Sequence, residues 1–161
     1  MLRFEELYVA YSPDVFRFAA WLAGNPDDAA DITSETFVRA WMNFEVIRTE
    51  TLKAYLFTIA RNIYLESLRK NQEHAALEET YADPRPGIEK MIEDQSDLDS
   101  VHRILQSFPE TDRSAFVMRV QHDLSYAEIA RVLQLSESAV KVKVHRVRKR
   151  LLGIQSRKEN I

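Results

Sequence analysis

The stretch SYAEIARVLQLSESAVKVKVHRVRKRLL, residues 125–152, decides which fold the sequence predicts. Ser125 and Glu128 have the Ser-x-x-Glu spacing of a capping box, which marks the start of a helix. After a short apolar stripe, Ser136 is placed to cap a second helix, predicted over Glu137–Leu152. Two helices joined by a short turn, with the second one basic, have the geometry that enters the major groove of DNA.

The second of these helices has one apolar face. Its apolar residues recur at helical spacings: Val140, Val144, Val147 and Leu151. Residues 140–144 also alternate Val and Lys with the period of a strand, but the helix is favoured because the longer period continues without a turn residue. The other faces carry the candidate DNA contacts: Ser136, Ser138, Ala139, Lys141, Val142, His145, Arg146, Arg148, Lys149 and Arg150.

The net charge of −3 hides a strong asymmetry along the chain. Residues 1–72 carry a net charge of −2, residues 73–99 carry −7, and residues 100–161 carry +6. A DNA backbone responds to the local field of the protein, not to its overall charge. The basic last third is therefore compatible with nucleic-acid binding, although the whole chain is acidic.

The composition excludes several classes of site. The chain has no cysteine, which excludes disulfides, thiol catalysis and cysteine-ligated zinc. Its three glycines are too few for a glycine-rich phosphate loop. Because the chain has neither a run of about 18 apolar residues nor a leader-like start, we expect a cytoplasmic protein. No metal, cofactor or small-molecule substrate is expected.

The first part of the chain predicts three helices. Residues 4–23 are expected to form a helix or a helix pair, with Pro13 at a bend and Gly24 as the C-cap. Asn25 is placed to cap the second helix, and residues 52–70 have the period of a third. The residues of the second helix that we expect to be buried are Ala30, Thr33, Phe37, Ala40 and Trp41. Those of the third are Leu52, Tyr55, Leu56, Ile59, Ile63 and Leu68.

The segment 73–97 differs from the rest, because it is acidic and its Pro84-Arg85-Pro86-Gly87 run interrupts any helix. It is expected to be a flexible linker with at most a short helix at residues 88–93. Helices are predicted again over residues 98–108 and 111–121. The predicted fold class is all-α, with two small helical domains, 1–72 and 98–161, joined by the acidic linker.

The two predicted domains together resemble a known pair. Residues 28–41, DAADITSETFVRAW, and residues 52–62, LKAYLFTIARN, resemble region two of bacterial RNA polymerase sigma factors of the extracytoplasmic-function (ECF) group. FPE at 108–110, SYAEIA at 125–130 and AVK at 139–141 resemble region four of that group. Both regions occur in the order typical of the group, without a region three.

This resemblance implies a transcription initiation factor and not an enzyme. Region two would bind the clamp coiled coil of the polymerase's largest subunit through the helix at 26–43. Its candidate contacts are Asp28, Asp31, Glu35, Phe37 and Arg39. Phe37 and Trp41 can also be read as core residues.

The resemblance also implies two contacts with promoter DNA. Region two would bind the melted minus-ten element, with its candidate residues being Arg48, Lys53, Arg61, Asn62, Arg69 and Lys70. Region four would bind the minus-thirty-five element through the contacts given above for residues 136–150. It would also rest on the polymerase flap tip through an apolar groove with Phe108, Phe116 and Val120, each of which can also be read as a core residue. An anti-sigma factor is an expected further partner.

Two other classes of function remain open at this point. A helix-turn-helix regulator that binds duplex DNA without polymerase would leave residues 1–70 unexplained. A metal-dependent hydrolase could use Asp27, Asp31 and Glu35, which lie one turn apart on one helix face. That stripe can equally be a solvated acidic surface.

Overall fold

The computed structural model describes residues 3–43, 52–77 and 97–159 of the 161-residue chain. Every regular element in these ranges is a helix, which confirms the all-α prediction. The helices are α1 (Phe4–Ala23), α2 (Pro26–Met42), α3 (Leu52–Leu77), α5 (Asp97–Ser107), α6 (Glu110–Val120), α7 (Tyr126–Leu133) and α8 (Glu137–Glu159). None of these helices is long and apolar enough to cross a membrane.

The predicted helix caps are confirmed by their hydrogen bonds and backbone conformation. The Ser125 hydroxyl accepts from the Glu128 amide at 3.1 Å, and the Ser136 hydroxyl accepts from the Ala139 amide at 3.1 Å. Asn25 caps α2 by accepting from the Asp28 amide at 2.8 Å. Gly24 closes α1 with φ of 83°, a left-handed conformation that glycine adopts at little cost.

Several helices are longer than the sequence predicted. Residues 4–23 form one helix, α1, which continues through Pro13, so of the two expected arrangements the single helix is confirmed and the helix pair is not. The helix α3 extends to Leu77, five residues into the segment predicted as linker, and α8 extends beyond Leu152 to Glu159. The alternating Val-Lys run lies inside α8, which confirms helix over strand. The predicted short helix at 88–93 lies outside the described residues.

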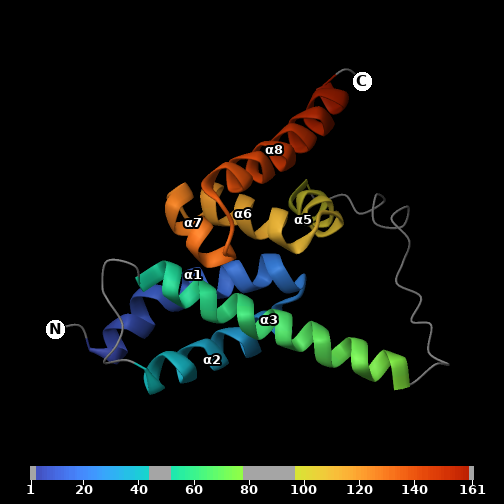
Figure 1. The fold of residues 1–161 in the computed structure, drawn as a ribbon. Coiled ribbons are helices and arrows are strands. Elements are labelled where there is room, and N and C mark those ends of the chain that lie inside the picture. Colours follow the sequence, from blue (N-terminus) through green and yellow to red (C-terminus); the bar gives the residue numbers. More distant parts are fainter. Residues whose placement is uncertain (1–2, 44–51, 78–96, 160–161) are drawn as a thin grey trace.

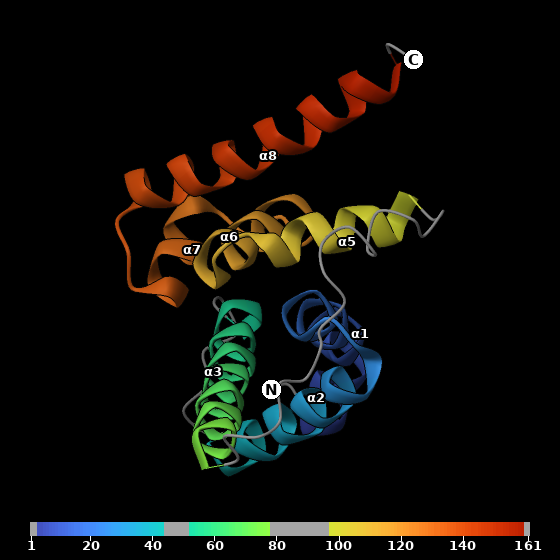
Figure 2. The ribbon, with the colours of Figure 1, turned by 90° about the vertical axis from the view of Figure 1, so that its right-hand side faces the viewer.

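The helices form two layers that rest on each other. Helices α1, α2 and α3 make one layer, and α5 to α8 make the other (Figures 1 and 2). Between the layers, α6 contacts α1, and α7 contacts α3. The core runs across this junction, where His122 of the second layer lies edge-on to Phe57 of α3 at 4.7 Å, and Phe57 stacks on Phe18 of α1 at 4.4 Å.

Several burial predictions are wrong, because neighbouring helices decide which side chains are covered. Phe57, Ala60 and Tyr64 of α3 are buried although they lie off the predicted apolar face, because α3 packs against helices on two sides. On α2 Ala40 is buried as predicted, but Ala29 is buried in place of Ala30, which is exposed. Trp41 is 60% exposed, because it lies in the last turn of α2, where its ring meets Phe4 on one side and solvent on the other.

Candidate nucleic-acid interface

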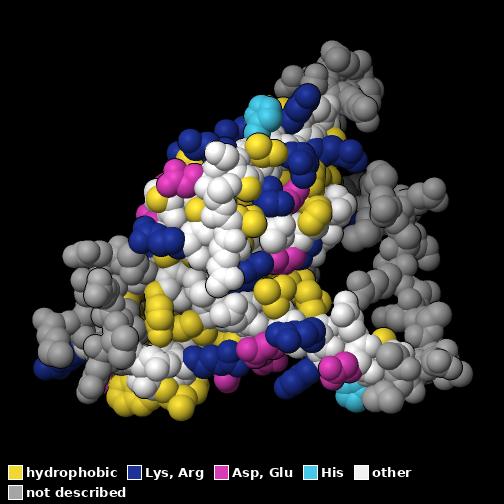
Figure 3. Space-filling view, in the orientation of Figure 1, with side chains coloured by type: hydrophobic (Ala, Val, Ile, Leu, Met, Phe, Trp, Pro, Cys, Tyr) yellow, Lys and Arg dark blue, Asp and Glu magenta, His cyan; other side chains and the backbone are white. Residues whose placement is uncertain are grey.

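The helix α8 turns one face to the core and the opposite face to solvent. Val140, Val144 and Val147 are at most 1% exposed, whereas Val142 on the opposite face is 55% exposed. Figure 3 shows Lys and Arg side chains lying along this helix. Ala139 is half-buried, and the other predicted contacts on α8 and its cap are exposed: Ser136, Ser138, Lys141, His145, Arg146, Arg148, Lys149 and Arg150.

One flank of α8 is organised around Tyr126, the first residue of α7. The Arg119 guanidinium lies 4.5 Å from the centre of the Tyr126 ring, and the Lys141 ammonium lies 5.5 Å from it. Both distances are within cation–π range. The start of α8 is thereby held beside the start of α7, with Lys141 still exposed. This contact could not be predicted from a short window of sequence, because Arg119 and Lys141 lie on different helices.

The other flank of α8 is tied to Asp112, a residue of the first turn of α6. The Asp112 side chain is 1% exposed, and its two oxygens accept from Lys143 at 2.9 Å and from Arg146 at 3.3 Å. Arg146 was predicted to contact phosphate, but here its guanidinium donates a hydrogen bond to this carboxylate. Asp112 was missed because it is a charged residue that sequence reasoning places on the surface.

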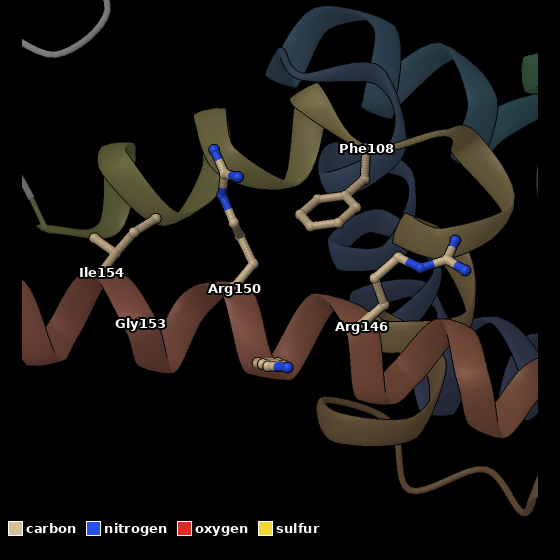
Figure 4. Close-up of a pocket in the computed structure, with 6 residues that line it drawn as sticks. Phe108, Arg146, Arg150, Gly153 and Ile154 are labelled. Carbon is tan, nitrogen blue, oxygen red and sulfur yellow. The ribbon is translucent and has the colours of Figure 1, made fainter.

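A hollow of about 550 Å³ lies between α8 and the junction of α5 and α6 (Figure 4). Its apolar lining comes from the Phe108 ring and the Ile154 side chain, and its other lining residues are Arg146, Lys149, Arg150 and Gly153. Of the other two residues predicted to face the flap tip, Phe116 is half-buried and Val120 is 48% exposed. The hollow therefore has both an aromatic ring and basic side chains in its lining.

The predicted minus-ten residues of α3 fall into two groups. Asn62, Arg69 and Lys70 are exposed. Arg61 instead donates two hydrogen bonds to Glu110 of α6, at 2.6 and 2.9 Å, and each side chain of this ion pair is 14% exposed. Arg48 lies outside the described residues.

Lys53 is also engaged at the junction between the layers. Its ammonium donates to the backbone carbonyl of His122 at 3.2 Å and lies 3.6 Å from Asp14 of α1. The His122 side chain is 1% exposed, and its Nε2 has no hydrogen-bond partner within the described structure. Burial of the ring, with a smaller contribution from the nearby Lys53 ammonium, lowers the pKa of His122 to about 4, and Asp14 opposes this shift.

Helices α5 and α6 add further contacts across the junction. Gln106 donates to the Trp21 carbonyl at 2.7 Å, and a ring nitrogen of His102 lies 3.0 Å from the Ala20 carbonyl. The His102 ring stacks on Trp21 at 4.7 Å. Arg113 of α6 donates to the Tyr64 hydroxyl at 3.1 Å. The two layers are thus joined by directional contacts as well as by apolar burial.

The face of α2 that was predicted to bind polymerase is acidic and mostly open. Asp28, Asp31 and Glu35 are exposed. Phe37 is 3% exposed and packs edge-on against Tyr8 and Phe4, so in this structure it is a core residue and offers no binding surface.

Arg39 is held by acidic neighbours instead of being free for a partner. It donates to Glu66 of α3 at 2.9 and 3.3 Å and to Glu35 at 3.2 Å. The hydrogen bonds from Arg39 hold the pKa of Glu66 below its usual range, and those to Glu66 raise the pKa of Arg39. The group ties α2 to α3.

Sequence reasoning missed an apolar surface at the end of α2. Val38 is 52% exposed, Trp41 60% and Met42 76%, and Figure 3 shows hydrophobic side chains gathered at this end of the helix. These three residues, together with Asp31 and Glu35, are called the α2 surface below. Exposed apolar side chains beside carboxylates indicate a surface for another macromolecule.

The carboxylate stripe does not form a metal centre in the structure. Among the residues that the structure describes, no group of three or more His, Cys, Asp or Glu side chains could hold a metal ion. Asp27, Asp31 and Glu35 are all exposed, as the side chains of a solvated acidic face are.

Comparison with protein families gives two matches. The family model described as Sigma-70 region 2 matches residues 7–74, and the one described as Sigma-70, region 4 matches residues 98–151. Both lie close to the domains predicted from the sequence, and together they leave out the acidic segment between them.

Comparison with individual proteins agrees. The chain is 31% identical over 158 residues to the ECF RNA polymerase sigma factor SigE of Mycolicibacterium smegmatis, covering 94% of this chain and 61% of that protein. It is 26% identical to the ECF RNA polymerase sigma factor SigM of Bacillus subtilis, covering 97% of each. Its fold is similar to that of the sigma factor RpoE of Bartonella quintana, solved with the anti-sigma factor NepR, with a TM-score of 0.81, 24% identity and coverage of 95% and 96%.

Proposed function

Because the chain belongs to the sigma-70 family, as an RNA polymerase sigma factor of the extracytoplasmic-function group, we propose that it binds core polymerase and directs it to specific promoters. The polymerase carries out the chemistry, and this protein is not an enzyme. The single observation that carries the proposal is that both polymerase-factor regions occur in order and cover most of the chain. The stand-alone regulator is set aside, because residues 7–74 match region 2.

The outer face of α8 is the proposed minus-thirty-five surface. Lys149, Arg148 and Arg150 are exposed cations suited to phosphates. Val142, 55% exposed on the same helix, is suited to contact a thymine methyl in the major groove. Ser136 and Ser138 lie at the helix start, whose amides also favour phosphate.

The proposed minus-ten surface is the polar side of α3, where the melted strand would lie on Asn62, Arg69 and Lys70. Lys53 and Arg61 also belong to this proposal, but they are engaged by the second layer in the described conformation. Their use on DNA requires that α6 moves away from α3, since one guanidinium cannot serve Glu110 and a phosphate fully at the same time.

The proposed polymerase contacts are the α2 surface and the hollow beside Phe108. The carboxylates of the α2 surface suit a basic partner, and Trp41 offers an aromatic anchor of the kind that dominates binding energy. We assign the clamp coiled coil to this surface and the flap tip to the hollow. An anti-sigma factor that covers the same surfaces would keep the protein inactive in the cytoplasm.

The test is reconstitution with sigma-free core polymerase, followed by gel filtration and run-off transcription. Co-elution and promoter-dependent transcripts are expected. Val38→Glu should abolish co-elution, because it adds a charge to the apolar part of the α2 surface. Val9→Glu is the matched control, since Val9 is 73% exposed on α1, and it should leave co-elution unchanged. A folded wild-type chain that fails to co-elute contradicts the proposal.

A further inference from the structure

Asp112 occupies a position where a carboxylate is costly unless it is paired. Its side chain is 1% exposed in the first turn of α6, within a run of buried residues from Asp112 to Ala115. Each of its oxygens accepts a hydrogen bond from a different side chain of α8, Lys143 or Arg146. The carboxylate is therefore an anchor between α6 and α8 that uses both of its oxygens on α8.

This anchor fixes the rotation of α8 about its own axis, which apolar packing alone does not determine. The inner face of α8 consists of short valine side chains, and apolar contact is not directional. Charge-assisted hydrogen bonds are directional. Lys143 and Arg146 lie three residues apart on one flank of α8, so holding both at one carboxylate sets the rotation of the helix about its axis. That rotation decides which side chains face away from the core.

The anchor also removes cations from the DNA-binding surface. The Lys143 side chain is 23% exposed and that of Arg146 is 58% exposed, yet each is drawn towards the interior by the same carboxylate. Lys149 and Val142, on the side of the helix opposite the core, are exposed. The phosphate contact first expected of Arg146 is thereby weakened.

We propose that Asp112 is a positioning residue for minus-thirty-five recognition: it holds α8 through Lys143 and Arg146 so that Val142 and Lys149 face the duplex, and it restrains two cations from binding phosphate at any sequence. Asp112 itself touches no DNA. The inference rests on the proposed function, because it requires that the outer face of α8 reads DNA.

The test uses holoenzyme reconstituted with Asp112→Asn and a promoter library randomised at the minus-thirty-five element. Asparagine keeps the size and an acceptor but removes the charge. Discrimination between preferred and disfavoured elements should fall about tenfold, the value of one good base contact. Binding to disfavoured elements at low salt should be kept or increased, because the released Lys143 and Arg146 can bind the DNA backbone. For the same reason the affinity should depend more steeply on salt, by the equivalent of about one phosphate contact.

Glu137→Gln is the matched control, since it makes the same charge change at an exposed residue at the start of α8. It should raise binding to all elements without changing their ranking. Equal losses at all elements with the ranking kept, after Asp112→Asn, would show a purely structural role and overturn the proposal.

Two further variants cover the case in which Asp112→Asn does not fold. Lys143→Gln and Arg146→Gln each remove one half of the anchor at a partly exposed side chain, and each should give a smaller loss of discrimination. Unchanged discrimination in both would overturn the proposal. A wild-type holoenzyme with no minus-thirty-five preference would instead contradict the proposed function.

Discussion

Val142 and Lys149 lie on the face of α8 that points away from the core, yet they are expected to act on different parts of DNA. An ammonium meets phosphates, which are the same at every sequence, whereas an isopropyl group meets the edge of one base. Neither side chain packs into the core, since Val142 is 55% exposed and Lys149 is exposed.

Lys149→Ala should weaken binding to all minus-thirty-five elements about equally and reduce the salt dependence by about one phosphate contact. Val142→Ala should leave the salt dependence unchanged and relax the preference at one base pair. Competition binding of the holoenzyme at several salt concentrations measures both. A change of base ranking caused by Lys149→Ala would contradict the division of roles.

The stability of the chain should depend on pH through His122. Its pKa is about 4 in the folded protein and near 6.5 when exposed, so between these values the unfolded chain binds the proton and the folded chain does not. The stabilisation is complete above about pH 6.5 and decreases as the pH falls towards 4, by up to about 3 kcal/mol. The groups around the ring that share in this balance are Asp14, Arg17, Lys53 and Asp123.

Urea unfolding of the wild type and of His122→Gln at pH 7 and pH 5 tests this prediction. The variant cannot take up the proton, so its loss of stability between the two pH values should be smaller than that of the wild type. Equal losses would mean that His122 is not buried as a neutral ring.

At the scale of the helix, local hydrogen bonds decide where each element begins. The capping box at Ser125 satisfies amides at the start of α7, and the hydroxyl of Ser136 does the same for α8 three residues after α7 ends. These caps set the length of the turn between the two helices. The length of this turn then sets the position at which α8 starts on the core.

Ser125→Ala should destabilise the protein by about 1 kcal/mol, because it removes the acceptor for the Glu128 amide. Ser138→Ala is the control, since Ser138 is an exposed serine in the first turn of α8 and the cap of that helix is Ser136. Thermal unfolding followed by circular dichroism measures both. A control variant that loses as much stability as Ser125→Ala would show that capping is not the cause.

At the scale of the whole molecule, the second layer covers part of the surface that the first would offer to DNA. The central contact is the pair of Arg61 and Glu110, which is 14% exposed at each side chain and joins α3 to α6. Partial burial makes such a pair stronger than a surface ion pair. Removing one partner leaves the charge of the other partly buried without a counter-charge.

Glu110→Arg should separate the layers in the free protein, because two guanidinium groups would then meet. The chain has no cysteine, so dyes at Val9→Cys and Leu152→Cys, one in each layer, report their distance by energy transfer. Lower transfer is expected for Glu110→Arg. Adding Arg61→Glu should restore the transfer, since the pair is then re-formed in the reverse sense. Unchanged transfer in the single variant would contradict a role for this pair in closing the layers.

Local chemistry explains most of what could be predicted from the sequence. A cap needs a hydroxyl or amide three residues from an amide, and an apolar face needs a period of 3.6 residues, so both are visible in short windows. The helices, their caps and the outward face of α8 were therefore predictable from residues 125–152 and their counterparts in the first domain. The two regions could be recognised because their motifs are equally local.

Contacts between residues far apart in the sequence account for the rest. Arg61 and Glu110 are 49 residues apart, and Asp112 and Lys143 are 31 apart, so no window contains either pair. Burial of Phe57 and exposure of Trp41 likewise depend on which helix lies beside them. A basic side chain is available to DNA when no carboxylate of the same molecule holds it, and that is a property of the packed helices and not of the helix on which it lies.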